Sequence, residues 1–356
     1  MKKISFGVGV LLKLAAAGIL LFPASAASAK GAFQVLENGE VSIDGQRFAD
    51  MGEYVTSDYF RRNGMRCGTR TPEILPDDRA ARSVKDCTLA MTKIQSEYWL
   101  CDAVYTIPVW FHVIYRSDGE GNIPASAINA QLNVLNQDFR AKANTPGADG
   151  FDTRIQFTLA GITRTMNDTW FNDEDNAGYT SALNRDPDRY VNIYTNTAGG
   201  YLGYAIFPQQ GAGLSVDGIV MNYQTVGGRN NGYLIYDQGR TLVHEMGHYL
   251  GLLHTFDGNA CSNSYTTGDL VKDTPAENTE HYACTQTTTC GSSDPIHNYM
   301  NYTPDSCMTE FTREQANRLV CSLVNYRPSL FQVSTEEGGV CSSSVVPSLL
   351  PLLLRN

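Results

Sequence analysis

Alternating apolar residues predict the strands of a sheet in the middle of the chain. Residues 105–115 are rich in β-branched and aromatic side chains and predict a strand, in which Pro108 marks an edge or an irregular first part. Residues 155–159 alternate between apolar and polar positions, and residues 191–194 predict a further strand. Pro124 begins a predicted helix, whose apolar stripe is Ile128, Leu132, Leu135 and Phe139.

Further along, the pattern predicts one more short strand and a C-terminal helix. Residues 196–235 are rich in Gly, Asn and Gln, and residues 218–223 within them predict a strand. That strand is either a place where an extended substrate pairs through its backbone or a structural edge strand. A capping box from Thr312 to Gln315 opens the helix, whose inward residues are Ala316, Leu319, Val320, Leu323 and Val324.

Between these elements, a predicted helix carries histidines at the spacing of metal ligands. His244 and His248 are four residues apart, which stacks their side chains on one face, about 5–6 Å apart at Cβ, where they can share one zinc ion. Gly251 lets the chain leave the helix, since glycine tolerates left-handed backbone angles, and the turn brings His254 back as a third ligand. The opposite face carries the apolar residues Leu242, Val243, Met246, Leu250 and Leu253.

Three protein ligands leave a fourth position for water, which is typical of a catalytic zinc site. Glu245 follows the first ligand and lies where it can take a proton from that water. The alternative is an ordinary amphipathic helix with hydrogen-bonded histidines, and we interpret His112, in the first strand, as a core histidine of this kind. Three of the six histidines fall within residues 244–254, which favours the metal site.

Length and charge limit the domain count and the classes of partner. The 356 residues are enough for one large or two modest domains. Hydrophobic residues make up 42% and charged residues 18%, which suits a globular core rather than disorder. The net charge is −10 and the pI is near 5.1, so the chain is a poor partner for nucleic acid or an anionic membrane.

Residues 1–29 have the layout of a secretory signal peptide. Lys2 and Lys3 give a positive start, residues 14–22 an apolar run, and the small residues after them a cleavage site. The uncharged run is too short to span a membrane. We therefore expect a secreted protein without a membrane span, in which nine cysteines imply disulfides and one cysteine left over.

The polar residues 30–98 form a candidate pro-segment. Within it, Cys67 lies in an Arg-Cys-Gly sequence, whose tight turn could place the sulfur on the zinc and displace the water. The alternative is that Cys67 is one half of a disulfide. The odd number of cysteines favours a free thiol but does not locate it.

Two stretches after the histidines have a less specific composition. Residues 268–275 place carboxylates and carbonyls in a polar loop, which suits either calcium or a solvated turn. Residues 336–356 form a tail that is Ser-rich and then Leu- and Pro-rich, and its apolar run is too short for a span. We assign no role to this tail.

The zinc motif, together with a downstream methionine, resembles the metzincin clan of metallopeptidases. Residues 244–254, Asp273-Thr274-Pro275 and Asn298-Tyr299-Met300-Asn301-Tyr302 together are similar to the pappalysin family, which includes ulilysin-like microbial proteases and fungal extracellular metalloproteases. The resemblance is specific from about Val104 to Pro328, weak before it and absent in the tail. It implies an α/β fold with a twisted mixed sheet, an active-site helix above a cleft and a loop-rich C-terminal subdomain.

The resemblance assigns roles to three residues after the zinc helix. Met300 would be the Met-turn residue, an apolar floor beneath the zinc. Tyr302 would lie near the metal and hydrogen-bond the developing oxyanion. Asp305 would line the pocket just after the scissile bond and select Arg or Lys there, because a buried carboxylate pairs strongly with a cation. The alternative is that Asp305 caps the turn before Cys307.

The resemblance also implies disulfides and a calcium site. The implied disulfides are Cys261–Cys290 and Cys284–Cys307, and Asp269 and Thr274 are candidates for the calcium. Proximity in sequence adds the pairs Cys87–Cys101 and Cys321–Cys341, which would leave Cys67 free. Related proenzymes carry an Arg-Cys-Gly-Thr stretch, which residues 66–69 match.

Taken together, these features predict a secreted, monomeric zinc metalloendopeptidase that is made as a latent precursor and acts on proteins or peptides. The predicted parts are a signal peptide (1–29), a pro-segment (30–98), a catalytic domain (99–335, divided near residue 254) and a tail (336–356). One rival is a non-catalytic binding protein with a structural zinc, although such a site would usually have a fourth protein ligand. Another is a disulfide-stapled surface protein.

Overall fold

The computed structural model describes residues 33–72, 87–89, 94, 97–228, 235–259 and 261–336. The predicted signal peptide, and the tail after residue 336, lie outside the described residues. Within these ranges no helix is both long and apolar enough to cross a membrane.

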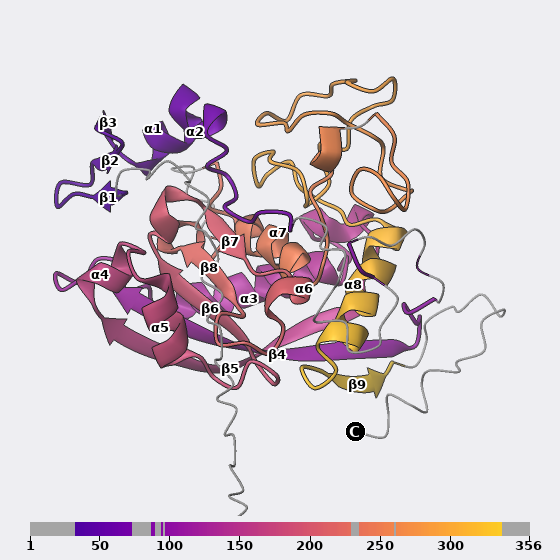
Figure 1. Cartoon of the computed structure of the whole chain (residues 1–356), viewed down its shortest axis with the longest axis horizontal. Helices are drawn as coiled ribbons and strands as arrows, with labels where there is room; N and C mark the ends of the chain where they lie inside the picture. The colour runs from indigo at the N-terminus through magenta and orange to yellow at the C-terminus, as the bar shows by residue number, and fades with distance from the viewer. Residues whose placement is uncertain are drawn as a thin grey trace, which may run out of the picture.

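A mixed sheet forms the base of the molecule (Figure 1). Its strands follow the order β5-β4-β6-β8-β7, and β9 pairs with the start of β4. Strands β4, β5, β6 and β8 run parallel, whereas β7 and β9 are antiparallel to their partners. The bounds are Ala103–Tyr115 (β4), Ile155–Met166 (β5), Val191–Asn196 (β6), Gly203–Ala205 (β7), Ile219–Asn222 (β8) and Gln332–Thr335 (β9). The α/β fold with a mixed sheet is therefore confirmed.

Pro108 lies where the central strand β4 changes partners. On one side of β4, pairing with β9 ends at Thr106 and pairing with β6 begins at Val109. On the other side, the register with β5 shifts between Val109 and Trp110. The predicted irregular stretch is thus present, but the predicted edge is wrong because β4 lies inside the sheet. A proline is tolerated there because one side of the strand has no partner to lose.

Three longer helices match the predicted ones. Helix α3 (Ala125–Phe139) begins directly after Pro124 and buries Phe139, whose ring lies 5.0 Å from that of Phe157 in β5. Helix α7 (Arg240–Tyr249) carries the histidine motif. Helix α8 (Arg313–Tyr326) starts with the predicted capping box. The shorter helical turns are η1 (Pro146–Asp149), α4 (Asp168–Phe171), α5 (Asn176–Leu183), η2 (Ala198–Gly200), α6 (Pro208–Gly211), η3 (Tyr223–Thr225) and η4 (Asp257–Asn259).

Residues 33–65 form a small unit at the β7 side of the sheet, drawn in indigo in Figure 1. It contains β1 (Gln34–Val35), β2 (Val41–Ile43) and β3 (Gln46–Phe48), then α1 (Met51–Thr56) and α2 (Asp58–Arg62). Its apolar side chains make a separate cluster, which Leu202 and Tyr236 join from the later chain. The hydroxyl of Tyr54 also donates to the carbonyl of Gly200 at 2.9 Å. The unit is therefore docked on the body of the protein.

Residues 250–312 are loop-rich, as expected, and contain the disulfides Cys261–Cys290 and Cys284–Cys307 that the resemblance implied. The pairs inferred from proximity in sequence are wrong. Cys87 bonds Cys321 instead, across 234 residues, with a Cα–Cα distance of 6.1 Å. The segment before β4 lies against α8, and proximity in space rather than in sequence decides the pairing. Cys101 is also disulfide-bonded, and Cys341 lies outside the described residues.

Candidate active site

Helix α7 is a fully buried element that carries the histidine motif. Each of its residues, Arg240–Tyr249, is buried. Its first turn is capped from a distance by Asp305, whose Oδ2 accepts hydrogen bonds from the backbone N–H groups of Gln238 at 2.9 Å and Arg240 at 3.1 Å. A carboxylate is stabilised at a helix N-terminus, because the first N–H groups of the helix lack partners within it.

Glycine is required at two positions around this helix. A Cβ on Gly247 would lie 2.4 Å from Sδ of Met300, so the thioether packs directly against the helix between the first two histidines. Gly251 has a φ of +93°, and a Cβ there would lie 2.4 Å from Oγ of Ser322. The turn at Gly251 ends the helix and sends the chain back toward the third histidine, as predicted.

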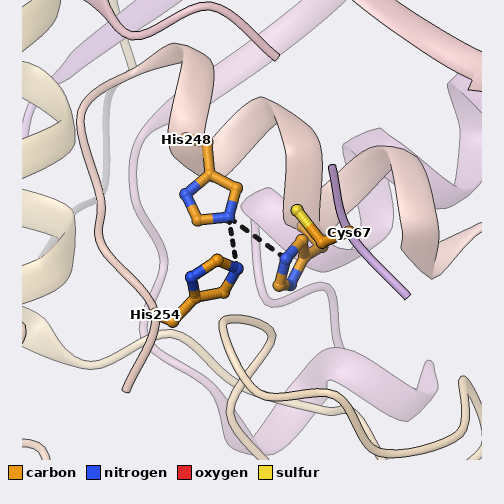
Figure 2. Close-up of side chains that lie close together, drawn as sticks. Cys67, His248 and His254 are labelled. Atoms are coloured by element: carbon orange, nitrogen blue, oxygen red, sulfur yellow. Dashed lines mark hydrogen bonds between the residues drawn. The ribbon is translucent and has the colours of Figure 1, made fainter. Parts of the chain in front are cut away.

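The three motif histidines converge at one point, and Figure 2 shows His248 and His254 there. Nε2 of His248 lies 3.2 Å from Nε2 of His244 and 3.0 Å from Nε2 of His254. Nδ1 of His244 lies 2.7 Å from the carbonyl oxygen of Tyr299, and Nδ1 of His248 lies 2.8 Å from that of Leu252. The backbone therefore fixes the orientation of the first two rings.

These contacts decide which ring nitrogens carry protons. A nitrogen that faces a carbonyl must donate, so Nδ1 of His244 and His248 is protonated and their Nε2 atoms keep bare lone pairs. Nδ1 of His254 faces the carboxylate of Asp257 at 3.7 Å. Burial lowers the pKa of His244 and His248 well below the usual value, so both rings are neutral. Lone pairs that face one another repel unless a cation lies between them, so this donor set fits a metal ion such as zinc.

Glu245 is fully buried beside the histidines. Its Oε2 accepts a hydrogen bond from Oγ1 of Thr69 at 2.8 Å, and Sγ of Cys67 lies 3.5 Å from the same oxygen. Burial raises the pKa of this carboxyl group. Oε1 has no hydrogen-bond partner in the described part of the chain. The motif alone gave no sign that a threonine near the N-terminus reaches this carboxylate.

Cys67 brings its sulfur to the same point (Figure 2). Its Sγ and one nitrogen of each motif histidine all lie within 4.8 Å of one another. Cys67 is buried and is not part of a disulfide, so the disulfide alternative is wrong. Burial raises the pKa of the thiol, which means that the sulfur needs a cation nearby to become a thiolate.

Tyr302 packs against the histidine rings. Its ring centroid lies 5.1 Å from that of His254 and 5.8 Å from that of His244. The ring of Phe256, which stacks on His254, has its centroid 4.9 Å from that of Tyr302. Burial raises the pKa of Tyr302 well above its usual value, so the phenol keeps its proton and can donate it in a hydrogen bond.

Arg66 is buried close to Asp305, a neighbour that the sequence did not suggest. The guanidinium carbon lies 4.8 Å from the ring centroid of Tyr236, and Nη2 lies 3.9 Å from Sδ of Met308. Burial raises the pKa of Asp305, and the charge of Arg66 opposes that rise. Oδ1 of Asp305 and two guanidinium nitrogens have no hydrogen-bond partner among the described residues. Asp305 therefore caps α7 rather than the turn before Cys307, and the positive charge of Arg66 lies close enough to act on its carboxyl group.

Residues 65–69 run along β7, the strand at the edge of the sheet. The contacts are Leu202 N–H to Met65 O (3.2 Å), Gly68 N–H to Gly203 O (2.8 Å) and Ala205 N–H to Thr69 Oγ1 (2.8 Å). The predicted strand at residues 218–223 is β8, which has β6 on one side and β7 on the other. Because both sides of β8 are paired, a substrate cannot add to it as a further strand. The alternative, that it is a structural edge strand, is also wrong. The edge is β7, whose three residues are too few to show a period in the sequence.

The two calcium candidates lie together in a C-terminal loop. Oγ1 of Thr274 donates to Oδ2 of Asp269 at 2.7 Å, and burial raises the pKa of Asp269 to about 8. Within the described ranges, no group of three His, Cys, Asp or Glu side chains includes Asp269. A separate cluster consists of Nε2 of His281 with the carboxylates of Glu277 and Asp294, each 3.1 Å away.

Comparisons with known proteins agree with this geometry. The sequence profile of the peptidase family described as pregnancy-associated plasma protein-A matches residues 176–324. An extracellular metalloprotease of Arthroderma otae is 38% identical over 223 residues, which cover 60% of this chain and 76% of that protein. An extracellular metalloprotease of Arthroderma benhamiae is 36% identical over 254 residues, which cover 68% of this chain and 87% of that protein.

Comparison with solved structures also finds similarity to metallopeptidases. A promirolysin mutant from Tannerella forsythia has a TM-score of 0.55 at 32% identity, covering 66% of this chain and 86% of that chain. Mature mirolysin from the same organism, in complex with a cleaved peptide, has a TM-score of 0.53 at 34% identity, covering 64% and 95%. This similarity favours an enzyme over the non-catalytic alternative. The chain belongs to the pappalysin family of metzincin peptidases, and it is a metalloendopeptidase.

Proposed function

We propose that this chain is the precursor of a secreted, zinc-dependent endopeptidase whose N-terminal segment blocks its own active site. The observation that carries the proposal is the convergence of three Nε2 atoms, with separations of 3.0 and 3.2 Å from the central one, beside the buried carboxylate of Glu245. His244, His248 and His254 would hold the zinc. A bound zinc ion polarises a peptide carbonyl and lowers the pKa of water to about 7.

Glu245 and Tyr302 would carry out the proton transfers and the charge stabilisation. Glu245 accepts a proton from the attacking water and passes it to the leaving amine. Its burial raises the pKa of the carboxyl group, which makes it a stronger base for that step. Tyr302 stays protonated and donates to the carbonyl oxygen as that oxygen becomes negative. Met300 supports the helix from below by packing on Gly247.

A basic side chain just after the scissile bond would enter the pocket that Arg66 fills in the precursor. Asp305 supplies a buried negative charge there, and Tyr236 supplies the face of an aromatic ring. Arg66 would therefore stand in for the substrate's side chain. This arrangement supports a preference for Arg or Lys at the first primed position.

Cys67 would keep the precursor inactive, because its sulfur takes the place that water needs. The disulfide Cys87–Cys321 ties the chain from residue 87 onward to α8. We therefore move the end of the pro-segment from residue 98 to a point between residues 72 and 87. Among the described residues, no disulfide holds residues 33–72, so this part would be able to leave after cleavage.

Secretion, calcium and a monomeric state complete the proposal. The layout of residues 1–29, the disulfides and the relatives named extracellular metalloproteases support secretion. A structural calcium ion would use Asp269 and Thr274, whose oxygens lie together.

Removing calcium with EGTA should lower the Tm while zinc content stays at one per chain, and an unchanged Tm would exclude the calcium site. Light scattering would test for a monomer.

The general-base role is tested with Glu245→Ala in the processed enzyme. The variant should keep its fold and one zinc per chain, and its cleavage of casein should fall by about 10²–10⁴-fold. Glu174→Ala, an exposed glutamate, is the matched control and should keep full activity. His254→Asn should lose the zinc in elemental analysis. Undiminished casein cleavage by Glu245→Ala would contradict the mechanism.

A further inference from the structure

The N-terminal segment contacts the active-site carboxylate as well as the histidines. Oγ1 of Thr69 lies 2.8 Å from Oε2 of Glu245 and 2.8 Å from the backbone nitrogen of Ala205. The N–H of Ala205 donates to the hydroxyl, so the single proton of the hydroxyl is free to go to Glu245. Both Thr69 and Glu245 are buried, and a hydrogen bond to a carboxylate is stronger away from water.

We propose that Thr69 is a second anchor of the latent state, which engages the general base through its hydroxyl while Cys67 takes the water's place as a metal ligand. This inference rests on the proposed role of Glu245. With the hydrogen bond in place, Oε2, the oxygen that lies beside Sγ of Cys67, already accepts from Thr69, so an attacking water would have to compete with this hydroxyl for it. The N–H of Ala205, on the edge strand β7, is also taken and cannot pair with a peptide substrate. The hydroxyl of Thr69 therefore engages both the carboxylate of Glu245 and the backbone N–H of Ala205.

The two anchors use different atoms of the segment. The backbone N–H of Thr69 donates to Sγ of Cys67 at 3.3 Å, whereas its side chain reaches Glu245. The close approach depends on Gly68, where a Cβ would lie 2.9 Å from the ring of Tyr201. A substitution of the Thr69 side chain thus removes the contact with Glu245 and leaves the contact with the sulfur in place.

The test measures how fast iodoacetamide alkylates Cys67 in the intact full-length chain. Glu245→Gln and Glu245→Ala are both expected to be inactive, so the precursor stays uncleaved, but only Gln keeps an oxygen that can accept from Thr69. Thr69→Val should speed alkylation about three- to tenfold in the Gln background. In the Ala background, where the acceptor is already missing, it should change the rate less than twofold. Thr69→Ser keeps the hydroxyl and should change the rate less than twofold in both backgrounds.

Two results would overturn the proposal. Equal acceleration by Thr69→Val in both backgrounds would mean that the hydroxyl acts through Ala205 alone, and no acceleration in the Gln background would mean that it anchors nothing. Thr69→Ala is the second variant if Thr69→Val changes the thermal unfolding of the chain. Casein cleavage by the Glu245→Gln chain would refute the general-base role instead, and the alkylation rates would still report the contact.

Discussion

At the scale of single residues, the partners of each side chain decide what it can do. The histidines were predicted from their spacing, but their tautomers follow from the carbonyls of Tyr299 and Leu252, which hold Nδ1. The two oxygens of Asp305 likewise differ, since Oδ2 caps α7 and Oδ1 has no hydrogen-bond partner among the described residues. Neither property is visible in a list of residues, because both depend on atoms from other segments.

Asp305→Asn tests the selection of basic residues. Asn keeps an oxygen to cap α7 but removes the charge, so kcat/KM for peptides with Arg after the scissile bond should fall by about 10- to 100-fold. Peptides with Leu at that position should be cleaved within about twofold of the wild-type rate, because they make no use of the charge. An equal loss for both peptides would show that Asp305 only supports the helix.

The lowered pKa of His112 predicts that the stability of the fold depends on pH. It is buried in β4, with Nδ1 2.7 Å from Thr163 and Nε2 3.0 Å from Asn192, and burial lowers its pKa to about 4 from 6.5. Between pH 4 and pH 6.5 the ring of His112 binds a proton in the unfolded chain but not in the folded one. The free energy of unfolding that this residue contributes is therefore fully present above pH 6.5 and is lost as the pH drops toward 4. A shift of this size corresponds to about 3 kcal/mol over the window.

The measurement is urea unfolding of the Glu245→Ala chain at pH 7 and pH 4.5, with and without His112→Gln. The variant should be less stable at pH 7 but should lose less stability on acidification, because it lacks the titrating ring. Parallel losses in both proteins would show that His112 does not titrate in this window.

At the scale of elements, long periodic segments were predicted well and most short ones were not. Helices α3, α7 and α8 and strands β4, β6 and β8 lie where the sequence pattern placed them, and β5 begins there but continues beyond the predicted residues 155–159 to Met166. Strands β1, β2, β3, β7 and β9 have two to four residues, which is too short for a period to be seen, whereas the four residues of β8 were predicted because they stand out as an apolar run between polar stretches. The end of α7 was predicted because Gly251, the residue that lets the chain turn, is adjacent to the helix in sequence. The start of α7 was not predicted, because the side chain that caps it, Asp305, comes from a distant segment.

Gly251→Ala tests how the end of α7 positions the third ligand. Its φ of +93° strains any other residue, by about 1–3 kcal/mol, and the added methyl would overlap Ser322. The unfolding free energy should fall by at least that amount, and zinc content should drop below one per chain because His254 is displaced. Gly39→Ala is the matched control, since Gly39 has a φ of +86° with nothing within 4 Å of a Cβ. It should keep its zinc, and full zinc retention by Gly251→Ala would contradict the argument.

At the scale of the whole molecule, three distant segments meet at one point. Residues 65–69 lie along β7, the histidine motif comes from α7 and the turn after it, and residues 300–305 come from the C-terminal loops. In Figure 1 these loops, in orange, and the indigo unit lie on the same side of the sheet as α7. The N-terminal segment that contacts the motif therefore lies far from it in sequence, since Thr69 and Glu245 are 176 positions apart.

Removal of the metal should expose the thiol of the precursor. In the intact Glu245→Ala chain, Cys67 should react slowly with iodoacetamide, because its sulfur is buried and would be bound to zinc. Treatment with 1,10-phenanthroline should raise the rate at least tenfold, since the bond that holds the thiolate is lost. Cys67→Ser is the control and should show no labelling at this position. A rate that does not change on chelation would mean that the sulfur does not bind the metal.

The sequence by itself determined the chemistry of this protein, whereas the tertiary structure decided which distant groups meet. The histidines, Glu245 and Gly251 lie within one helix and the turn that follows it, so the helical period and one local turn fix their arrangement. Thr69 and Glu245 are 176 positions apart, and Cys87 and Cys321 are 234 apart. Such contacts depend on how the sheet, α7 and the N-terminal unit pack against one another, and no local pattern of apolar residues encodes that packing.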